Sequence, residues 1–136
     1  LYGATGGEFY ASGKAGERFA VRNSGAIAVI EGTGQHLCEY MTRGTVVVLG
    51  DVGYNVGAGM SGGIIYVYDE SDPLVKRLNH SYVQSFLLAG GEELQELKAL
   101  LKKHYEYTGS PRAFEILSNF EIASQRFKKV APESSE

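Results

Sequence analysis

The chain of 136 residues contains one cysteine, no tryptophan and only three prolines. A single cysteine, Cys38, cannot form a disulfide within the chain, which excludes the disulfide-stapled class of small secreted domains and agrees with a reducing compartment. No apolar run approaches the roughly 20 residues that span a bilayer, and the N-terminus lacks a signal-peptide pattern. We therefore expect a cytoplasmic protein without a membrane partner.

An excess of basic charge is also missing. The chain has 13 basic and 16 acidic residues and a formal net charge of −3. Binding to nucleic acid requires a basic stripe, and neither half of the chain has one. We therefore expect no nucleic-acid partner.

Glycine, in contrast, is abundant and periodic. Fifteen of the 18 glycines precede residue 64. Four of them recur every 19 residues and open short apolar runs: Gly6, Gly25, Gly44 and Gly63, followed by the runs 7–12, 26–31, 45–50 and 64–69. A fixed period near 20 residues, built from β-prone runs, is typical of a solenoid whose repeats bury their apolar faces by stacking.

The second half of each period matches as well. Residues 18–22, 37–41 and 56–60 align at this spacing, and the polar residues Asn23, Thr42 and Ser61 follow them. We therefore predict two extended segments per coil, joined at glycine corners, with equivalent strands parallel and about 4.8 Å apart. The predicted fold class is an all-β solenoid, a right-handed parallel β-helix with C-terminal α-helices.

The glycine-rich character ends near Asp72, which predicts three units. Residues 1–72 are expected to form the β-helix coils, residues 73–130 a helical extension packed on them, and residues 131–136 a disordered tail. Within the extension, apolar residues at helical spacing predict a helix over 92–107.

A second helix is expected directly after the first. Thr108 and Gly109 end the first helix, and Ser110 followed by Pro111 is typical of an N-cap and a first helical residue. This second helix is expected to reach about Leu117, and residues 127–130 are expected to be extended.

Apolar residues occupy both faces of the predicted strands. The columns Ile27/Val46/Ile65 and Val29/Val48/Val67 are expected to face inward, and Phe9/Ala28/Val47/Tyr66 and Ala11/Ile30/Leu49/Tyr68 outward. A sheet that is apolar on both faces is covered on both. We expect the 92–107 helix to cover part of the outer face and a partner to cover the remainder.

Two well-known catalytic or binding strings occur within the repeat. Residues 57–62 satisfy G-x-G-x-x-G and residues 59–63 satisfy G-x-S-x-G, with Ser61 as the nucleophile of a hydrolase. The acid and base of that hydrolase would come from Asp69 or Asp72 and from His80 or His104. Both strings require a strand-to-helix turn, whereas a predicted strand follows here. We therefore interpret their residues as structural corners of the repeat.

Other candidate residues have simpler structural interpretations. His36 and Cys38 could supply two metal ligands, but no second pair stands at a zinc-like spacing. His104 is expected to stabilise a helix dipole, and Arg18 and Arg22 to lie on a solvated face or in an ion pair. We therefore expect no catalytic, cofactor-binding or metal-binding residue in this chain.

Four long segments carry a resemblance to a known family. They read GERFAVRNSG (16–25), CEYMTRGTVVVLG (38–50), GAGMSGG (57–63) and EYTGSPRA (106–113). With them, residues 1–130 resemble the C-terminal glycine-repeat domain of the large (alpha) subunit of glutamate synthase. The resemblance implies a right-handed β-helix whose earlier coils precede Leu1.

The resemblance also implies a function for the parent enzyme. That enzyme transfers the amide nitrogen of glutamine to 2-oxoglutarate and uses FMN and an iron–sulfur cluster, which belong to other domains. The implied role of this chain is to hold the amidotransferase and FMN domains in register, without catalytic residues of its own.

We also expect the isolated chain to self-associate. The alternative is a β-helix subunit of a formylmethanofuran dehydrogenase-like complex, which the segment EYTGSPRA disfavours.

Overall fold

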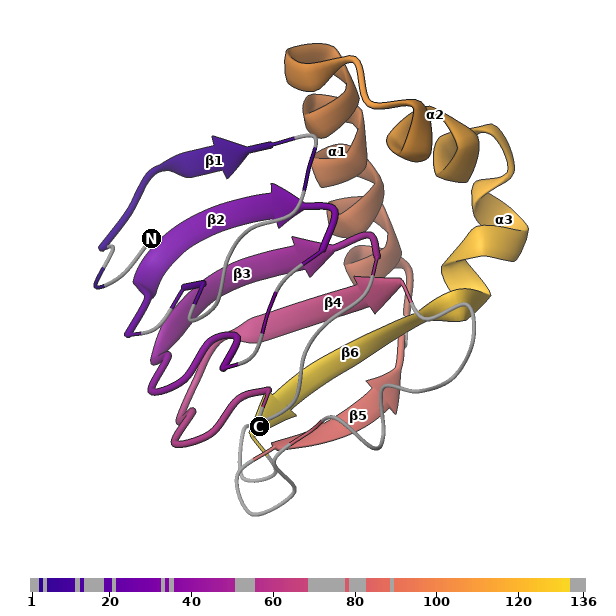
Figure 1. Cartoon of the computed structure of the whole chain (residues 1–136). Helices are drawn as coiled ribbons and strands as arrows, with labels where there is room; N and C mark the ends of the chain where they lie inside the picture. The colour runs from indigo at the N-terminus through magenta and orange to yellow at the C-terminus, as the bar shows by residue number, and fades with distance from the viewer. Residues whose placement is uncertain are drawn as a thin grey trace.

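The computed structural model describes residues 3, 5–11, 13, 19–20, 22–32, 34, 36–50, 56–68, 78, 83–88 and 90–132. The elements in chain order are β1 (Glu8–Tyr10), β2 (Ser24–Ile30), β3 (Arg43–Val48), β4 (Ile64–Tyr68), β5 (Val83–Leu87), α1 (Gly90–Thr108), α2 (Pro111–Ser118), α3 (Phe120–Ala123), the 3-10 helix η2 (Ser124–Arg126) and β6 (Phe127–Pro132). The strands form one sheet and the helices form a layer beside it (Figure 1).

The sheet has six strands in the order β1-β2-β3-β4-β6-β5. Strands β1 to β4 run parallel, with Glu8 opposite Ile27 and Thr45 opposite Ile64, as the 19-residue period predicts. Strand β6 then pairs antiparallel with β4 and with β5, so the sheet is mixed. The stacking of equivalent strands is therefore confirmed for the first four strands, while the last two break the repeat.

The predicted fold class is wrong. The chain is an α/β fold with one mixed sheet and a helical layer, rather than an all-β solenoid or parallel β-helix. The segments expected to form a second strand in each coil are turns, since residues 19–20, 37–40 and 57–59 lie in no strand. The predicted second strand of each coil is therefore absent from these residues, and the described strands form one sheet.

Backbone conformation explains why these segments are not strands. Each turn contains two left-handed residues separated by one position. These pairs are Ala20 (φ 60°) with Arg22 (59°), Cys38 (58°) with Tyr40 (57°), and Gly57 (77°) with Gly59 (69°). An extended strand needs negative φ at every residue, so an apolar pattern alone could not identify these segments as turns.

The turns nevertheless stack on one another through backbone hydrogen bonds. The N–H of Cys38 donates to the carbonyl oxygen of Phe19 at 2.8 Å, and the N–H of Gly57 donates to that of Leu37 at 2.9 Å. The period therefore sets the spacing of the turns as well as that of the parallel strands.

The predicted inward and outward columns are wrong for β2. The pairing shifts between Ser24 and Ile27, so Ala28 rather than Ile27 lies opposite Val46. Because side chains alternate between the faces of a strand, a shift of one residue exchanges the two faces. Ile27 and Val29 therefore face the helices, and Ala28 and Ile30 face the turns. The predicted outward positions of Phe9 and Ala11 are wrong as well, because Phe9 pairs with Ala28, its ring lies 5.9 Å from that of Phe19, and Ala11 packs on the same side of the sheet.

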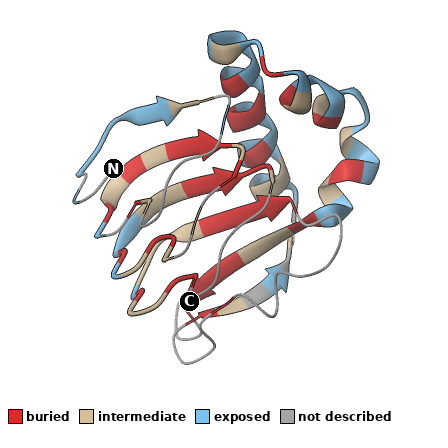
Figure 2. Cartoon of the chain, in the orientation of Figure 1, coloured by how far each residue is buried: buried red, intermediate tan, exposed pale blue. Residues whose placement is uncertain are grey.

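Two hydrophobic cores lie on opposite faces of the sheet. The core between the sheet and the turns includes Ile30, Val46, Val48, Ile65, Val67, Leu37, Cys38 and Met41. The core between the sheet and the helices includes Val29, Val47, Tyr66, Leu97, Leu101, Ile116 and Phe127. In Figure 2 the buried residues accordingly follow β2, β3 and β4 and the inner side of α1. The prediction that the first helix covers one face of the sheet is confirmed.

The helical predictions are confirmed in their main points. Helix α1 covers the predicted range 92–107 and ends at Thr108, and Ser110 caps α2 by accepting a hydrogen bond from the N–H of Ala113. Strand β6 begins at Phe127 as expected. Within the described part of the chain, none of the helices has the length and apolar character needed to cross a lipid bilayer.

Two of the repeat glycines occupy positions that favour glycine. Gly44 has a φ of +107° and Gly63 a φ of +89°. A Cβ atom on Gly44 would lie 2.5 Å from the carbonyl oxygen of Ala26, and one on Gly63 would lie 2.6 Å from Cε of Met41. The left-handed backbone therefore favours glycine at both positions, and at Gly44 the close approach of the Ala26 backbone requires it as well.

Candidate functional site

A buried polar cluster joins the helical layer to the sheet. Glu31 directly follows β2, and its Oε2 accepts hydrogen bonds from Nε2 of His104 at 2.9 Å and from Oγ of Ser110. His104 lies on α1 and Ser110 precedes α2, and both side chains are fully buried. We refer to Glu31, His104 and Ser110 as the corner cluster.

The chain around Gly109 explains how the two donors reach one carboxylate. Thr108 Oγ1 donates to the carbonyl oxygen of His104 at 2.6 Å and accepts from the N–H of Ser110 at 3.2 Å. Gly109 has a φ of +67°, and its N–H donates to the carbonyl oxygen of Tyr105. This left-handed glycine ends α1 and turns the chain into α2 within two residues.

The hydrogen bonds of the corner cluster attach the helical layer to the sheet. Ser110 Oγ donates to Glu31 and accepts from the N–H of Ala113 at 3.1 Å, so its hydroxyl is occupied on both sides. A nucleophilic serine needs a base at its hydroxyl. Among the described contacts, the side chains of Ser110 and His104 are instead joined only through Glu31. His104 Nδ1 is buried and has no hydrogen-bond partner.

Arg112 adds a second attachment next to the corner cluster. Its Nε donates to the carbonyl oxygen of Leu49, just beyond β3, at 3.0 Å. Its guanidinium also lies 5.2 Å from the ring centroid of Tyr68 on β4, within cation–π range. Consecutive segments of the α1–α2 corner thus bind the carboxyl ends of three neighbouring strands.

The structure separates the residues of the hydrolase string. Ser61 precedes β4 at its amino end, whereas His104 binds Glu31 at the carboxyl end of β2. Since β2, β3 and β4 are parallel, these residues lie at opposite edges of the sheet, about 16 Å apart for a five-residue strand. Asp69, Asp72 and His80 lie outside the described residues.

The glycine string at residues 57–62 forms a turn followed by a strand. Residues 57–59 are a turn and β4 begins at Ile64, so no helix N-terminus follows the glycines. A Cβ on Gly57 would lie 2.8 Å from Cγ1 of Val83, and one on Gly59 would lie 2.5 Å from the ring of Tyr40. The glycines therefore allow neighbouring segments to pack closely, as the architectural interpretation predicts.

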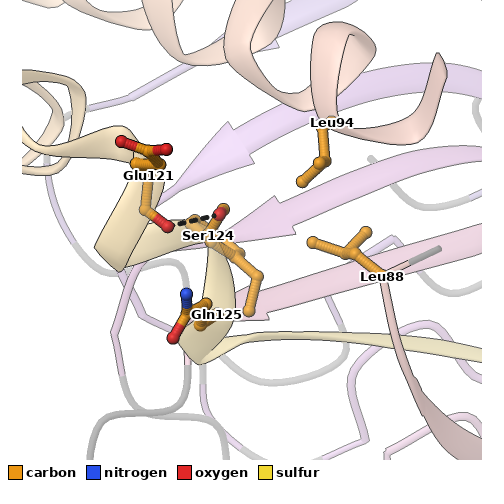
Figure 3. A pocket seen from close by; sticks show the side chains of 6 residues that line it. Leu88, Leu94, Glu121, Ser124 and Gln125 are labelled. Atoms are coloured by element: carbon orange, nitrogen blue, oxygen red, sulfur yellow. Dashed lines mark hydrogen bonds between the residues drawn. The ribbon is translucent and has the colours of Figure 1, made fainter. Parts of the chain in front are cut away.

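Two hollows open on the surface of the described residues. The first has a volume of about 540 Å³ and is lined by Leu88, Leu94, Glu121, Ser124, Gln125 and Phe127. Figure 3 shows the side chains of Leu88 and Leu94 pointing across it toward Ser124 and Gln125. The second, of about 440 Å³, is lined by Glu8, Phe9, Tyr10 and Tyr107 at the outer edge of β1. We call the first the α1–η2 hollow.

Comparison with known proteins identifies the family. The family model described as GXGXG motif matches residues 1–133. The chain belongs to the GXGXG motif family.

Relatives of this GXGXG domain are glutamate synthases. The chain is 54% identical over 137 residues to ferredoxin-dependent glutamate synthase 1, chloroplastic/mitochondrial, of Arabidopsis thaliana, and 100% of the chain is covered. It is 52% identical over 135 residues to the NADPH glutamate synthase large chain of Bacillus subtilis, with 98% covered. It is also 52% identical over 132 residues to the NADH glutamate synthase of Schizosaccharomyces pombe, with 97% covered. The chain spans only 8%, 9% and 6% of the lengths of these three relatives.

The metal and anion candidates of the GXGXG domain have other contacts. His36 Nδ1 lies 2.5 Å from Oε2 of Glu39, and Cys38 is buried in the core on the turn side of the sheet. Burial raises the pKa of the Cys38 thiol well above its ordinary value. Arg22 is exposed and lies 5.7 Å from the ring centroid of Tyr40. Arg18 lies outside the described residues, among which no three His, Cys, Asp or Glu side chains gather to hold a metal ion.

Sequence reasoning missed Glu31, the centre of the corner cluster. The residue stands at the end of the apolar run 26–31, where a carboxylate reads as the polar end of a strand. The available signal was the serine of the EYTGSPRA segment, because an N-cap serine that is also buried needs a second partner for its hydroxyl proton.

Proposed function

We propose that this chain is a non-catalytic structural domain or subunit of a glutamate synthase, which converts glutamine and 2-oxoglutarate to glutamate. In this proposal it holds the glutamine amidotransferase and FMN-containing domains in register. It would act in the cytoplasm, as the sequence predicts. The observation that carries the proposal is family membership over residues 1–133 together with identities above 50% to glutamate synthases.

The geometry of the chain supports a structural role. The polar side chains buried between the sheet and the helices hydrogen-bond to one another and to backbone groups, and they bind the α1–α2 corner to three strands. In the described residues, Ser61 lies at the opposite edge of the sheet from the buried histidine. We therefore assign no step of the reaction to this chain.

We place the cofactors of the parent enzyme in its other domains. A cluster held by cysteine thiolates needs several cysteines, and this chain has only Cys38, which is buried. The alternative, a subunit of a formylmethanofuran dehydrogenase-like complex, gains no support from the three relatives described above, since all are glutamate synthases.

Removal of this domain from the full enzyme tests the proposal. Glutamate formation is measured with glutamine and with ammonia as nitrogen donors, in the complete enzyme and in one lacking residues 1–136. We expect glutamine-dependent formation to fall at least tenfold and ammonia-dependent formation to fall much less. Coupling of glutamine hydrolysis to glutamate formation at full efficiency without the domain would refute the scaffold role.

A point variant tests whether Ser61 takes part in the reaction. Ser61→Ala removes the hydroxyl of the hydrolase string from an exposed corner. We expect the complete enzyme carrying this substitution to retain nearly full activity with both nitrogen donors. An ester-hydrolysing activity that this variant abolishes would instead assign Ser61 a catalytic role.

A further inference from the structure

The α1–η2 hollow lies where the start of α1, α3, η2 and the start of β6 meet. Leu88 precedes α1, Leu94 lies in its second turn, and Ser124 and Gln125 belong to η2. Figure 3 shows that the leucines line one side and the polar residues the other. The hollow is therefore open to solvent and amphipathic.

The apolar side of the hollow is large enough to accept side chains from a partner. Phe127 is fully buried at its base, and Leu88 and Leu94 are half-buried along its wall. A volume of about 540 Å³ compares with roughly 30 Å³ for a water molecule in the liquid. Apolar surface gains free energy when it is removed from water, so an apolar side chain would be favoured there over solvent.

The polar side of the hollow favours a positively charged group on a partner. Glu121 is its only charged lining residue among those described. Cations on the same elements have contacts elsewhere. Arg126 Nη1 donates to Oη of Tyr68 at 3.4 Å, Lys129 Nζ lies 2.6 Å from Glu93 Oε2, and Lys98 Nζ lies 5.7 Å from the ring centroid of Phe120. A lysine or arginine from a partner would complement Glu121 and could hydrogen-bond to the exposed amide of Gln125.

We propose that the α1–η2 hollow binds a basic segment from another part of the glutamate synthase polypeptide, which inserts an apolar side chain between Leu88, Leu94 and Phe127 and pairs a lysine or arginine with Glu121. This inference rests on the proposed function. The relatives supply the source of such a segment, since this chain corresponds to less than a tenth of their length.

Cysteine labelling in the complete enzyme tests the proposal. Gln125→Cys places a thiol in the hollow, and Glu115→Cys places a matched thiol on α2 outside it, both at exposed positions. Labelling with a maleimide is followed at each site by peptide mass spectrometry. We expect Gln125→Cys to react at least tenfold more slowly than Glu115→Cys, and equal rates would overturn the proposal. If Gln125→Cys does not fold, Ser124→Cys reports on the same hollow.

Charge reversal tests the cation of the segment. Combined with the cysteine in the hollow, Glu121→Arg should accelerate labelling about tenfold, while Glu115→Arg, combined with the same cysteine, should leave the rate unchanged. If the cysteine in the hollow is labelled equally slowly with and without Glu121→Arg, the assignment of a basic segment is overturned. Protection that depends on enzyme concentration, or that is lost on desalting, would assign the hollow to a second copy or to a small molecule and would also overturn it.

The same preparations separate this inference from the proposed function. An unprotected hollow in an enzyme that still needs the domain for glutamine-dependent synthesis would reject the docking segment alone. A protected hollow in an enzyme that couples fully without the domain would reject the scaffold role alone.

Discussion

Glu31 is the single side chain on which the corner cluster depends. Its carboxylate accepts from two fully buried donors, His104 and Ser110. Each buried donor left without an acceptor costs about 1 to 3 kcal/mol. We therefore expect Glu31→Ala to lower the free energy of unfolding by about 2 to 4 kcal/mol, measured by urea titration.

A second carboxylate provides the control for that measurement. Glu8 pairs with Lys103 at 3.4 Å, but both side chains are more than 40% exposed. Exposed ion pairs contribute little, so Glu8→Ala is expected to cost less than about 1 kcal/mol. Equal losses for Glu31→Ala and Glu8→Ala would contradict the anchoring role of the corner cluster.

A repeat glycine and a helical glycine differ in what they tolerate. Gly44 has positive φ and no room for a Cβ, whereas Gly91 lies in α1 with open space around it. Gly44→Ala is expected to destabilise by about 1 to 3 kcal/mol, and Gly91→Ala to stabilise by up to about 1 kcal/mol because alanine favours the helix. Thermal unfolding of the two variants checks the opposite signs, and a shift of the same sign would be inconsistent with this account.

At the scale of elements, the period predicted the parallel strands but not the turns that lie between successive strands. Equivalent residues of β3 and β4 pair 19 positions apart, as the glycines indicate. The turns were missed because non-glycine residues such as Ala20 and Cys38 adopt left-handed conformations there, and L-residues seldom do so. Neighbouring turns are bonded to one another, since the N–H of Cys38 donates to the carbonyl oxygen of Phe19 and the N–H of Arg22 donates to that of Glu39. No local propensity records those contacts.

The faces of β2 were mispredicted because the opening glycines alone set the expected register. The shift between Ser24 and Ile27 shortens the spacing to β3 by one residue, although Gly25 and Gly44 are 19 residues apart. The glycines that close the two runs, Gly32 and Gly50, are 18 residues apart and agree with the shift. Asn23 contributes to this irregular corner, since its Oδ1 accepts from the N–H of Ala26 and its Nδ2 donates to the carbonyl oxygen of the same residue. The helices were easier to predict, because the cap at Ser110 and the apolar spacing of α1 are local signals.

Strand β1 is one of the two edge strands of the sheet and a candidate for self-association. It pairs with β2 alone, and its residue Phe9 is 41% exposed. Unpaired strand edges recruit other chains. We expect the isolated chain to form concentration-dependent oligomers in sedimentation experiments and Phe9→Lys to reduce them. Phe114→Lys, on a helix and at a site that is 57% exposed, should have no such effect, and equal reduction by both variants would point away from β1.

At the scale of the whole molecule, the buried thiol links stability to pH. Burial raises the pKa of Cys38, so the folded chain keeps a proton that the unfolded chain releases above about pH 8.5. Stability from this group is complete below that pH and decreases as the pH rises above it. Between pH 8 and 10 we expect the free energy of unfolding to fall less steeply in Cys38→Ala than in the parent chain. Identical slopes would show that the thiol titrates alike in both states.

The order in which the chain leaves the ribosome gives the corner cluster a further consequence. Glu31 meets His104 and Ser110 across 73 and 79 residues, whereas neighbouring parallel strands are only about 19 residues apart. Strands β1 to β4 can therefore pair during synthesis while α1 is still inside the ribosomal tunnel, and one apolar face of their sheet stays bare until the last third of the chain emerges. We expect nascent chains stalled before α1 to be the aggregation-prone species and the ones that chaperones bind.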